Sequence, residues 1–159
     1  MKAVTVREIK EELSSLSPRE VRELCLRLSR FKKENKELIT YLLFEASDEA
    51  SYVESVKREI DEQFELVNRK SYYLFKKSIG KILRNTRKYI RYSQVRQTEV
   101  ELLIYFCHKL KKISPRIHRN AGLLNLYNRQ VDTIIKKVSL LHEDLQLDYE
   151  SELAELKGE

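Results

Sequence analysis

The sequence has few of the residues that make turns. Only three glycines and two prolines occur in 159 residues. A fold built from many short strands needs a turn about every ten residues, so this shortage excludes a β-rich architecture. It also excludes most phosphate-cradling loops, because these depend on glycine for their left-handed backbone, and neither the P-loop pattern nor the dinucleotide-binding pattern occurs. Long helices remain as the expected structure.

Cysteine is also scarce. Cys25 and Cys107 are the only two, and a single possible bridge does not make a disulfide framework. Each lies within a helical apolar pattern, so we expect both to be reduced thiols that fill the core. The chain reaches Glu8 before any apolar stretch forms, which argues against a secretory signal and predicts a cytoplasmic protein.

Long hydrophobic runs are missing. The longest fully apolar run, Leu102 to Cys107, has six residues, whereas a helix needs about 20 to cross a bilayer. We therefore expect neither a membrane span nor a membrane partner.

Catalytic and metal-binding patterns are missing too. His108, His118 and His142 have no partner at helical spacing and neither cysteine belongs to a C-x-x-C motif, so no zinc site is expected. Cys107 and His108 are neighbours on a helix and point about 100° apart, which denies them a direct hydrogen bond and a nucleophilic role. The carboxylate pairs have the spacing of solvated surface acids. The sequence predicts a protein that is not an enzyme and has no cofactor, metal or small-molecule substrate.

Charged residues make up 35% of the chain and hydrophobic ones 42%, a composition typical of a folded domain with a highly charged surface. Two capping boxes predict helix starts near the N-terminus. Thr5 pairs with Glu8, and Ser17 pairs with Glu20 behind Pro18, which sets φ for the first helical position.

The spacing of apolar residues defines the helices further along. After Ser17, a stripe of apolar residues predicts one buried helix face. Asn35 is expected to cap a third helix whose segment 38–44 is apolar nearly all round, so that it should lie inside the fold. The predicted stripe after Ser17 consists of Val21, Leu24, Cys25, Leu28 and Phe31.

Four more helices follow. An acidic amphipathic helix begins near Ser47 and Asp48, and a basic one covers 70–93. A sixth helix, apolar all round at 102–107, should be central and should end at Ser114 and Pro115. A loop at 120–122 precedes the last long helix, 123–145. The acidic residues after this helix are expected to form at most one short helical turn. The buried face of the acidic helix is predicted as Val53, Val56, Ile60, Phe64 and Val67.

These elements predict an all-α protein of about seven helices. We expect a single helical domain at 1–146 and an acidic C-terminal tail at 147–159. Shifting the sequence by 64 residues superimposes the two apolar helices. A shift of 97 residues instead relates Ser17-Pro18-Arg19 to Ser114-Pro115-Arg116. Because these two periods are incompatible, the sequence argues against a regular array of repeats. The expected architecture is a right-handed superhelix-like stack of helical hairpins or an irregular bundle, with two central apolar helices.

Two segments carry a resemblance. The opening Leu13 to Glu20 with its following helix, and Glu101 to Leu110 with its Tyr-Phe pair before an amphipathic closing helix, resemble small all-helical bacterial proteins of uncharacterised function. The order of elements is also similar to short HEAT-like or armadillo-like hairpin stacks. That likeness implies protein or peptide binding on a concave face.

The net charge of +6 hides a strong polarisation. Residues 1–68 hold 12 basic and 15 acidic side chains, residues 69–119 hold 15 and 2, and residues 120–159 hold 4 and 8. No acidic residue occurs between Glu65 and Glu99. The middle third is therefore where a negatively charged partner would bind.

On a helical projection, six cations of the segment 70–93 fall within an arc of about 80° with a 4-3-4-3 spacing. We call this set the basic ridge, and it is our candidate anion- or partner-binding site. Like charges one turn apart cost a few tenths of a kcal/mol per pair, so something acidic is expected to face it. The basic ridge consists of Lys70, Lys77, Lys81, Arg84, Lys88 and Arg91.

Several partners could face the basic ridge. Inside the molecule, the acidic fourth helix or the acidic tail could cover it, or water and salt could screen it. Outside, it could bind an acidic protein segment, a second copy of the chain, or nucleic acid without sequence preference, with nearby tyrosines for stacking. The leading hypothesis is a helical binding or scaffolding module for protein–protein interaction, and nucleic acid is the alternative. Tyr41 and Tyr105 are expected in the core, and the tyrosines beside the ridge are Tyr72, Tyr73, Tyr89 and Tyr92.

Overall fold

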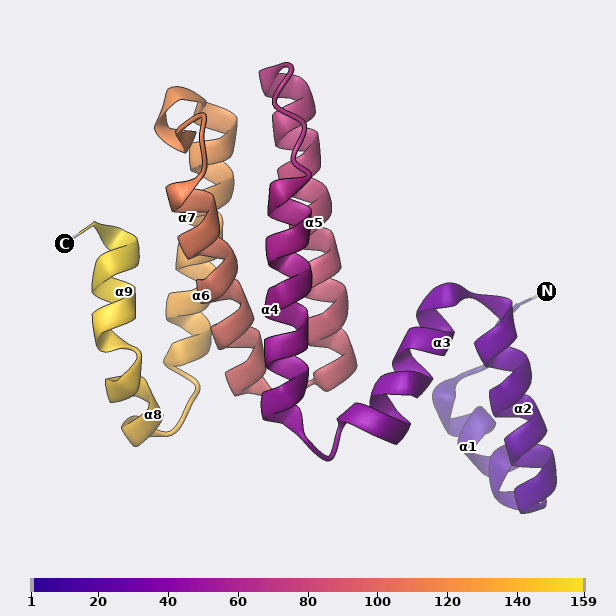
Figure 1. The fold of residues 1–159 in the computed structure, drawn as a ribbon. Helices are drawn as coiled ribbons and strands as arrows, with labels where there is room; N and C mark the ends of the chain where they lie inside the picture. Colours follow the sequence, from indigo (N-terminus) through magenta and orange to yellow (C-terminus); the bar gives the residue numbers. More distant parts are fainter. Residues whose placement is uncertain (1, 159) are drawn as a thin grey trace. The chain divides into compact units, whose positions relative to one another are not determined.

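The computed structural model describes residues 2–158. These residues form nine α-helices, one π-helical turn and one 3-10 turn, with no strand among them, which confirms the all-α class and exceeds the expected seven helices (Figure 1). The chain divides into two compact units, Met1–Phe44 and Glu45–Glu159.

The first unit contains α1 (Val6–Ser15), α2 (Pro18–Phe31) and α3 (Lys33–Thr40), followed by the π-helical turn Tyr41–Glu45. Both predicted capping boxes are confirmed. The Thr5 hydroxyl accepts from the backbone N–H of Glu8 at 3.3 Å, and the Ser17 hydroxyl accepts from that of Glu20 at 3.4 Å. Each glutamate bonds back to the N–H of its capping residue, so both helix starts have the reciprocal pattern.

The predicted cap of the third helix is wrong. α3 begins at Lys33 with Lys32 as its N-cap, and no side chain bonds there. The amide of Asn35 instead donates to the backbone carbonyl of Leu28 at 2.9 Å and links α3 to α2. An asparagine can bond to backbone groups in several ways, and here a tertiary contact replaced the local one.

The predicted burial in this unit is also wrong. Leu42, Leu43 and Phe44 are 58%, 69% and 76% exposed, so the segment 38–44 is not a central helix, although Tyr41 is buried. In α2, Val21 is half-buried and the rest of the predicted stripe is exposed, Cys25 included. Apolar periodicity shows which face seeks cover, but a unit of this length has too little chain to enclose a helix.

The second unit is built around two helix pairs. The first pair is α4 (Glu49–Glu65) and α5 (Tyr72–Ser93), and the second is α6 (Arg96–Lys112) and α7 (Ala121–Val138) (Figure 1). Asp48, Ser71 and Asn120 cap the starts of α4, α5 and α7 with side-chain hydrogen bonds. The predicted apolar face of α4 is buried as expected.

α6 is the centre of this unit, as its all-round apolar sequence predicted. It packs against α4, α5, α7 and the C-terminal helix α9 (Glu150–Lys157). Eight of its residues are buried, among them Phe106 and Cys107 at 0% exposure. A helix can bury residues on every side only when other helices surround it.

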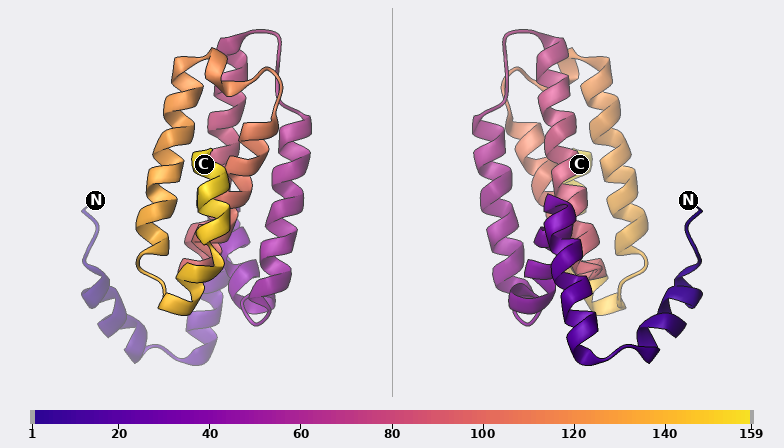
Figure 2. Two further views of the ribbon diagram at one scale, coloured as in Figure 1. Left: turned by 90° about the vertical axis from the view of Figure 1, so that its left-hand side faces the viewer. Right: turned by 90° about the vertical axis from the view of Figure 1, so that its right-hand side faces the viewer.

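The C-terminal region differs from the prediction. The last long helix ends at Val138 rather than near 145, and the presumed tail forms α8 (Glu143–Asp148) and α9. Leu156 is 2% exposed, and the buried Tyr127 hydroxyl donates to its carbonyl at 2.7 Å. A few apolar residues in an acidic segment were enough to dock α9 on α6 and α7 (Figure 2, left).

Among residues 2–158, no helix has the length and apolar character needed to cross a membrane.

Candidate functional site

The basic ridge lies on α5 and just before it. Lys70 is outside the helix, because Ser71 is the N-cap in extended backbone, and the backbone N–H of Lys70 bonds to the side chain of Asn68. The helical projection therefore holds for the five ridge residues from Lys77 to Arg91 and not for Lys70. All six ridge side chains are exposed except that of Lys88, which is half-buried.

Most ridge cations have no carboxylate of their own. Within residues 2–158, no carboxylate oxygen lies within 4.0 Å of the side-chain nitrogens of the five ridge residues other than Lys88. Elsewhere the same unit does pair its cations. Lys57 lies 2.6 Å from Glu101, Lys109 lies 2.7 Å from Asp61, and both contacts join α4 to α6.

Lys88 differs from the other ridge residues because it packs on aromatic rings. Its Nζ lies 4.6 Å from the ring centroid of Tyr89 and 6.0 Å from that of Tyr92. A cation over an aromatic face is attracted by the ring quadrupole. Lys88 is thus part of the folded structure as well as part of the ridge.

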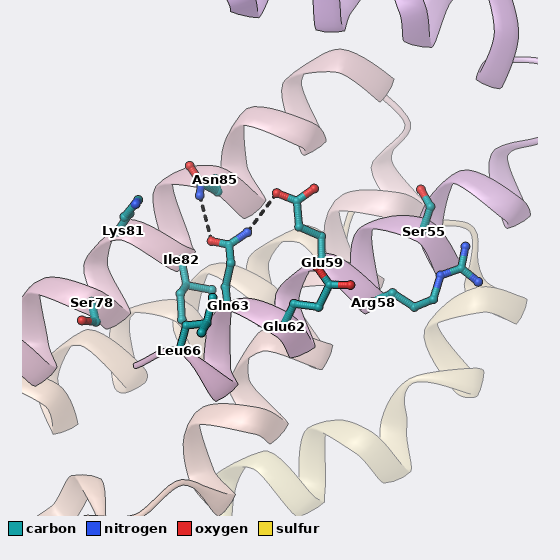
Figure 3. A pocket seen from close by; sticks show the side chains of 10 residues that line it. All are labelled: Ser55, Arg58, Glu59, Glu62, Gln63, Leu66, Ser78, Lys81, Ile82 and Asn85. Carbon is teal, nitrogen blue, oxygen red and sulfur yellow. Dashed lines mark hydrogen bonds between the residues drawn. The ribbon is translucent and has the colours of Figure 1, made fainter. Parts of the chain in front are cut away.

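The acidic helix α4 flanks the ridge. Glu59 and Glu62 of α4 line one groove with Lys81 of α5, a shallow space of about 630 Å³ (Figure 3). Glu59 accepts hydrogen bonds from the amide of Gln63 at 3.1 Å and from the hydroxyl of Tyr89 at 2.6 Å. Its carboxylate is therefore bound to neutral donors rather than to a ridge cation.

The acidic C-terminal helices lie against other elements. α9 packs on α6 and α7, where the ammonium of Lys111 donates to the carbonyl of Glu155 and His108 Nδ1 lies 3.5 Å from the Glu155 carboxylate. These contacts direct the acidic segment towards α6. The sequence suggested that the acidic helix α4 or the acidic C-terminal segment covers the ridge. In the described part of the chain, neither forms an ion pair with a ridge residue other than Lys88.

The tyrosines beside the ridge divide into two groups. Tyr72 and Tyr73, at the start of α5, are 43% and 74% exposed. Tyr89 is half-buried with its hydroxyl on Glu59, and Tyr92 is 8% exposed. Aromatic surface for a partner is therefore concentrated at the N-terminal end of the ridge.

A second basic feature was not expected from the sequence. A groove of about 670 Å³ runs between α5 and α7, and we call it the α5–α7 groove. It has four cations and one carboxylate, that of Asp132, in its lining. The cations are Lys76 and Arg87 of α5 and Arg129 and Lys136 of α7. Lys76 and Arg87 fall outside the arc of the ridge, and only the position of α7 across the groove from α5 reveals that they belong to a common surface.

Other titratable groups stabilise the fold. Burial raises the pKa of the Cys107 thiol to about 12, so its sulfur stays protonated at neutral pH beside His108. Burial, with the hydrogen bond to Asp61, also raises the pKa of the Tyr105 phenol. Tyr105, which was expected in the core, is half-buried, and its hydroxyl bonds to Asp61. No three histidine, cysteine or acidic side chains come together as metal ligands in residues 2–158.

Comparisons with models of protein families, with curated proteins and with solved structures find no match to this chain.

Proposed function

We propose that this protein is a non-enzymatic binding or scaffolding module whose basic ridge binds an acidic segment of a partner protein. The observation that supports this most directly is that the exposed ridge cations of α5, a set that does not include Lys88, have no carboxylate partner among the described residues. Carboxylates of the same unit lie close by, yet they bind to neutral donors or to cations elsewhere. A surface that keeps several like charges without compensation is suited to a partner of opposite charge.

The shape of the ridge favours a helical acidic partner. A single helix presents its cations on a convex edge with 4-3-4-3 spacing, and a second helix with acidic residues at the same spacing can lie along it. Each exposed ion pair contributes only about 0.2–1 kcal/mol. The complex would therefore be weak and sensitive to salt unless apolar contacts add to it, and the exposed rings of Tyr72 and Tyr73 provide such contacts.

Nucleic acid bound through the same ridge is the second candidate. The exposed cations could bind the phosphates of nucleic acid equally well, since phosphate contacts require only positive charge. Base stacking is less well supported, because Tyr89 and Tyr92 are engaged with the protein itself. For this reason we place the acidic protein segment first. A second copy of the chain is one source of such a segment, since α8 and α9 carry exposed acids.

The two candidates can be separated by fluorescence anisotropy on the full chain. The probes are a synthetic helical peptide with glutamates at three- and four-residue spacing and a labelled single-stranded oligo-dT. The ridge variant combines Lys77→Glu, Lys81→Glu and Arg84→Glu. The control makes the same charge change on the first unit with Lys10→Glu, Arg22→Glu and Arg27→Glu, all exposed and without an ion pair to any described residue.

We expect the ridge variant to bind the acidic peptide at least about tenfold more weakly than the control does. Equal loss in both variants would show that net charge, not the ridge, determines binding. Loss of oligo-dT binding in the ridge variant with no peptide binding by the unmodified protein would establish the nucleic-acid alternative instead.

A further inference from the structure

The α5–α7 groove differs from the ridge in shape and in the arrangement of its charges. The ridge is convex, whereas the groove is a concave channel between two helices that run in the same direction (Figure 1). No carboxylate lies within ion-pair distance of Lys76, Arg87, Arg129 or Lys136 in the described part of the chain. The groove is therefore a separate candidate site.

Arg87 is held in a fixed position at the middle of the groove. Its Nη2 donates to Oε1 of Gln130 at 2.8 Å, and Gln130 is 3% exposed. The amide nitrogen of Gln130 donates in turn to the carbonyl of Leu126 at 3.2 Å, which sets the amide so that its oxygen faces Arg87. One nitrogen of the guanidinium is thereby anchored, and its other N–H groups remain to bind an anion.

Lys76 is placed at one end of the groove by a glycine. An ideal Cβ on Gly122 would lie 2.7 Å from the Nζ of Lys76, so the ammonium occupies the space above the first turn of α7 that only glycine leaves open. The N-terminal turn of a helix carries partial positive charge. A lysine ammonium at that position is unfavourable by itself, and an anion bound beside it would compensate both charges.

The cations are spread along the groove rather than gathered at one point. Lys76 lies beside Gly122, Arg87 is level with Gln130, and Lys136 follows further along α7. Gly122 and Lys136 are 14 residues apart, which corresponds to about 21 Å at the helical rise of 1.5 Å per residue. A single small anion would contact one or two of these cations, whereas a linear polyanion would contact all four.

The neutral groups of the lining favour recognition by charge alone. Both ends of the Gln130 amide are engaged, and the hydroxyl of Thr133 donates to the carbonyl of Arg129 at 2.7 Å. Among the described residues that line the groove, none is aromatic, so it offers no ring on which a nucleobase could stack. Asn125 is the one other side-chain amide in the lining.

We infer that the α5–α7 groove binds a linear chain of phosphate groups without bases, that is, inorganic polyphosphate. The guanidinium of Arg87 and the three other cations contact phosphates spaced along the chain, and the turn opened by Gly122 accepts one end of it. Single-stranded nucleic acid presents the same phosphate chemistry with bases attached. This site does not rest on the function proposed for the ridge, because the two use different residues.

The test measures binding to the full chain by titration calorimetry at low salt without divalent cations. The probes are a short-chain sodium polyphosphate, a single-stranded oligo-dT of equal total charge, and orthophosphate. The groove variant combines Lys76→Ala, Arg87→Ala and Lys136→Ala. The matched control, Lys10→Ala with Arg22→Ala and Arg27→Ala, removes the same charge from exposed positions of the first unit.

We expect the groove variant to bind polyphosphate at least about tenfold more weakly and the control to change by less than about threefold. Equal losses would show that binding follows net charge, and this would overturn the site. Tighter binding of oligo-dT than of polyphosphate would assign the phosphate chain to nucleic acid and overturn the base-free ligand. Orthophosphate that binds as tightly as polyphosphate would overturn the linear ligand.

Two single substitutions test the geometry without removing any cation. Gly122→Ala places a Cβ where the Lys76 ammonium lies, so the lysine must move while the charge stays the same. We expect weaker polyphosphate binding. Asp132→Asn removes the one carboxylate of the lining and is expected to strengthen binding about two- to fivefold. The absence of both effects would contradict the assignment even if the triple variant does not fold.

Discussion

The hydroxyl of Tyr105 donates to both carboxylate oxygens of Asp61 at 2.8 Å, and thereby joins the central helix α6 to α4. The ammonium of Lys109, one turn further along α6, lies 2.7 Å from the same carboxylate. The hydrogen bond to Asp61 raises the pKa of Lys109 above its usual value. One acid of the acidic helix thus binds two groups of the helix beside it, while the ridge residues of α5 other than Lys88 have no carboxylate within ion-pair distance among the described residues.

The substitution Asp61→Ala is therefore expected to destabilise the protein. It removes a partly buried hydrogen bond and a half-exposed ion pair, with an expected cost of about 1–2 kcal/mol. Urea denaturation monitored by circular dichroism measures this change. Glu65→Ala serves as the control, because Glu65 is an exposed acid on the same helix and forms no ion pair with any described residue. Equal stability of the two variants would contradict a structural role for Asp61.

Local signals in the sequence predicted local structure well. The capping boxes at Thr5 and Ser17, the start of α4 at Asp48 and the central position of α6 all follow from residues within a few turns of each other. The same rules failed where burial depends on distant chain. Segment 38–44 and the face of α2 are apolar, yet they are mostly exposed.

The candidate site shows the same division between local and distant information. The ridge from Lys77 to Arg91 could be predicted because helical spacing alone sets it. The α5–α7 groove could not be predicted, because it depends on which helix lies across from α5 and on how far the two helices are shifted along their axes. The contact between Arg87 and Gln130, 43 residues apart in the chain, fixes that shift and has no signal in the sequence.

The two cysteines are expected to react very differently. Cys25 is exposed on α2, whereas Cys107 is fully buried with its pKa raised to about 12 by burial. Alkylation requires the thiolate and access to it. Iodoacetamide at neutral pH should therefore modify Cys25 within minutes and leave Cys107 unmodified until the protein is unfolded, as peptide mass spectrometry will show. Rapid modification of Cys107 in the native protein would mean that α6 is not enclosed.

Tyr127 should make the stability of the protein depend on alkaline pH. Burial raises the pKa of its phenol from 10.0 to about 12, and its hydroxyl donates to Leu156 of α9. The neutral phenol is thus favoured in the folded state. The contribution of this phenol to the free energy of unfolding is complete below pH 10 and is lost as the pH rises through about 12. The buried thiol of Cys107 acts in the same direction, because burial raises its pKa from 9.0 to about 12.

We therefore expect the free energy of unfolding to fall less steeply between about pH 9 and pH 11 for Tyr127→Phe than for the unmodified chain. Urea titrations at both pH values measure the difference. Tyr73→Phe is the control, since its ring is 74% exposed. If the free energy of unfolding falls equally steeply with pH in Tyr127→Phe and in the unmodified protein, ionisation of this phenol does not contribute to the pH dependence of stability.

The absence of an ion-pair partner for Arg84 among the described residues leads to a prediction of opposite sign. Arg84 is exposed and lies three residues after Lys81, three before Arg87 and four before Lys88. Arg84→Glu replaces repulsions on one helix face with attractions, and a glutamate four residues before a lysine has the favourable orientation. We expect a gain of about 0.5–1 kcal/mol in thermal or urea stability at low salt, which disappears at about 1 M salt because exposed charges are then screened. Lys57→Glu is the matched reversal of a paired cation, and it should destabilise the protein by breaking contacts with Glu54 and Glu101. Destabilisation by Arg84→Glu as well would mean that the ridge already has an acidic partner within the molecule, and the argument for an external one would lose its basis.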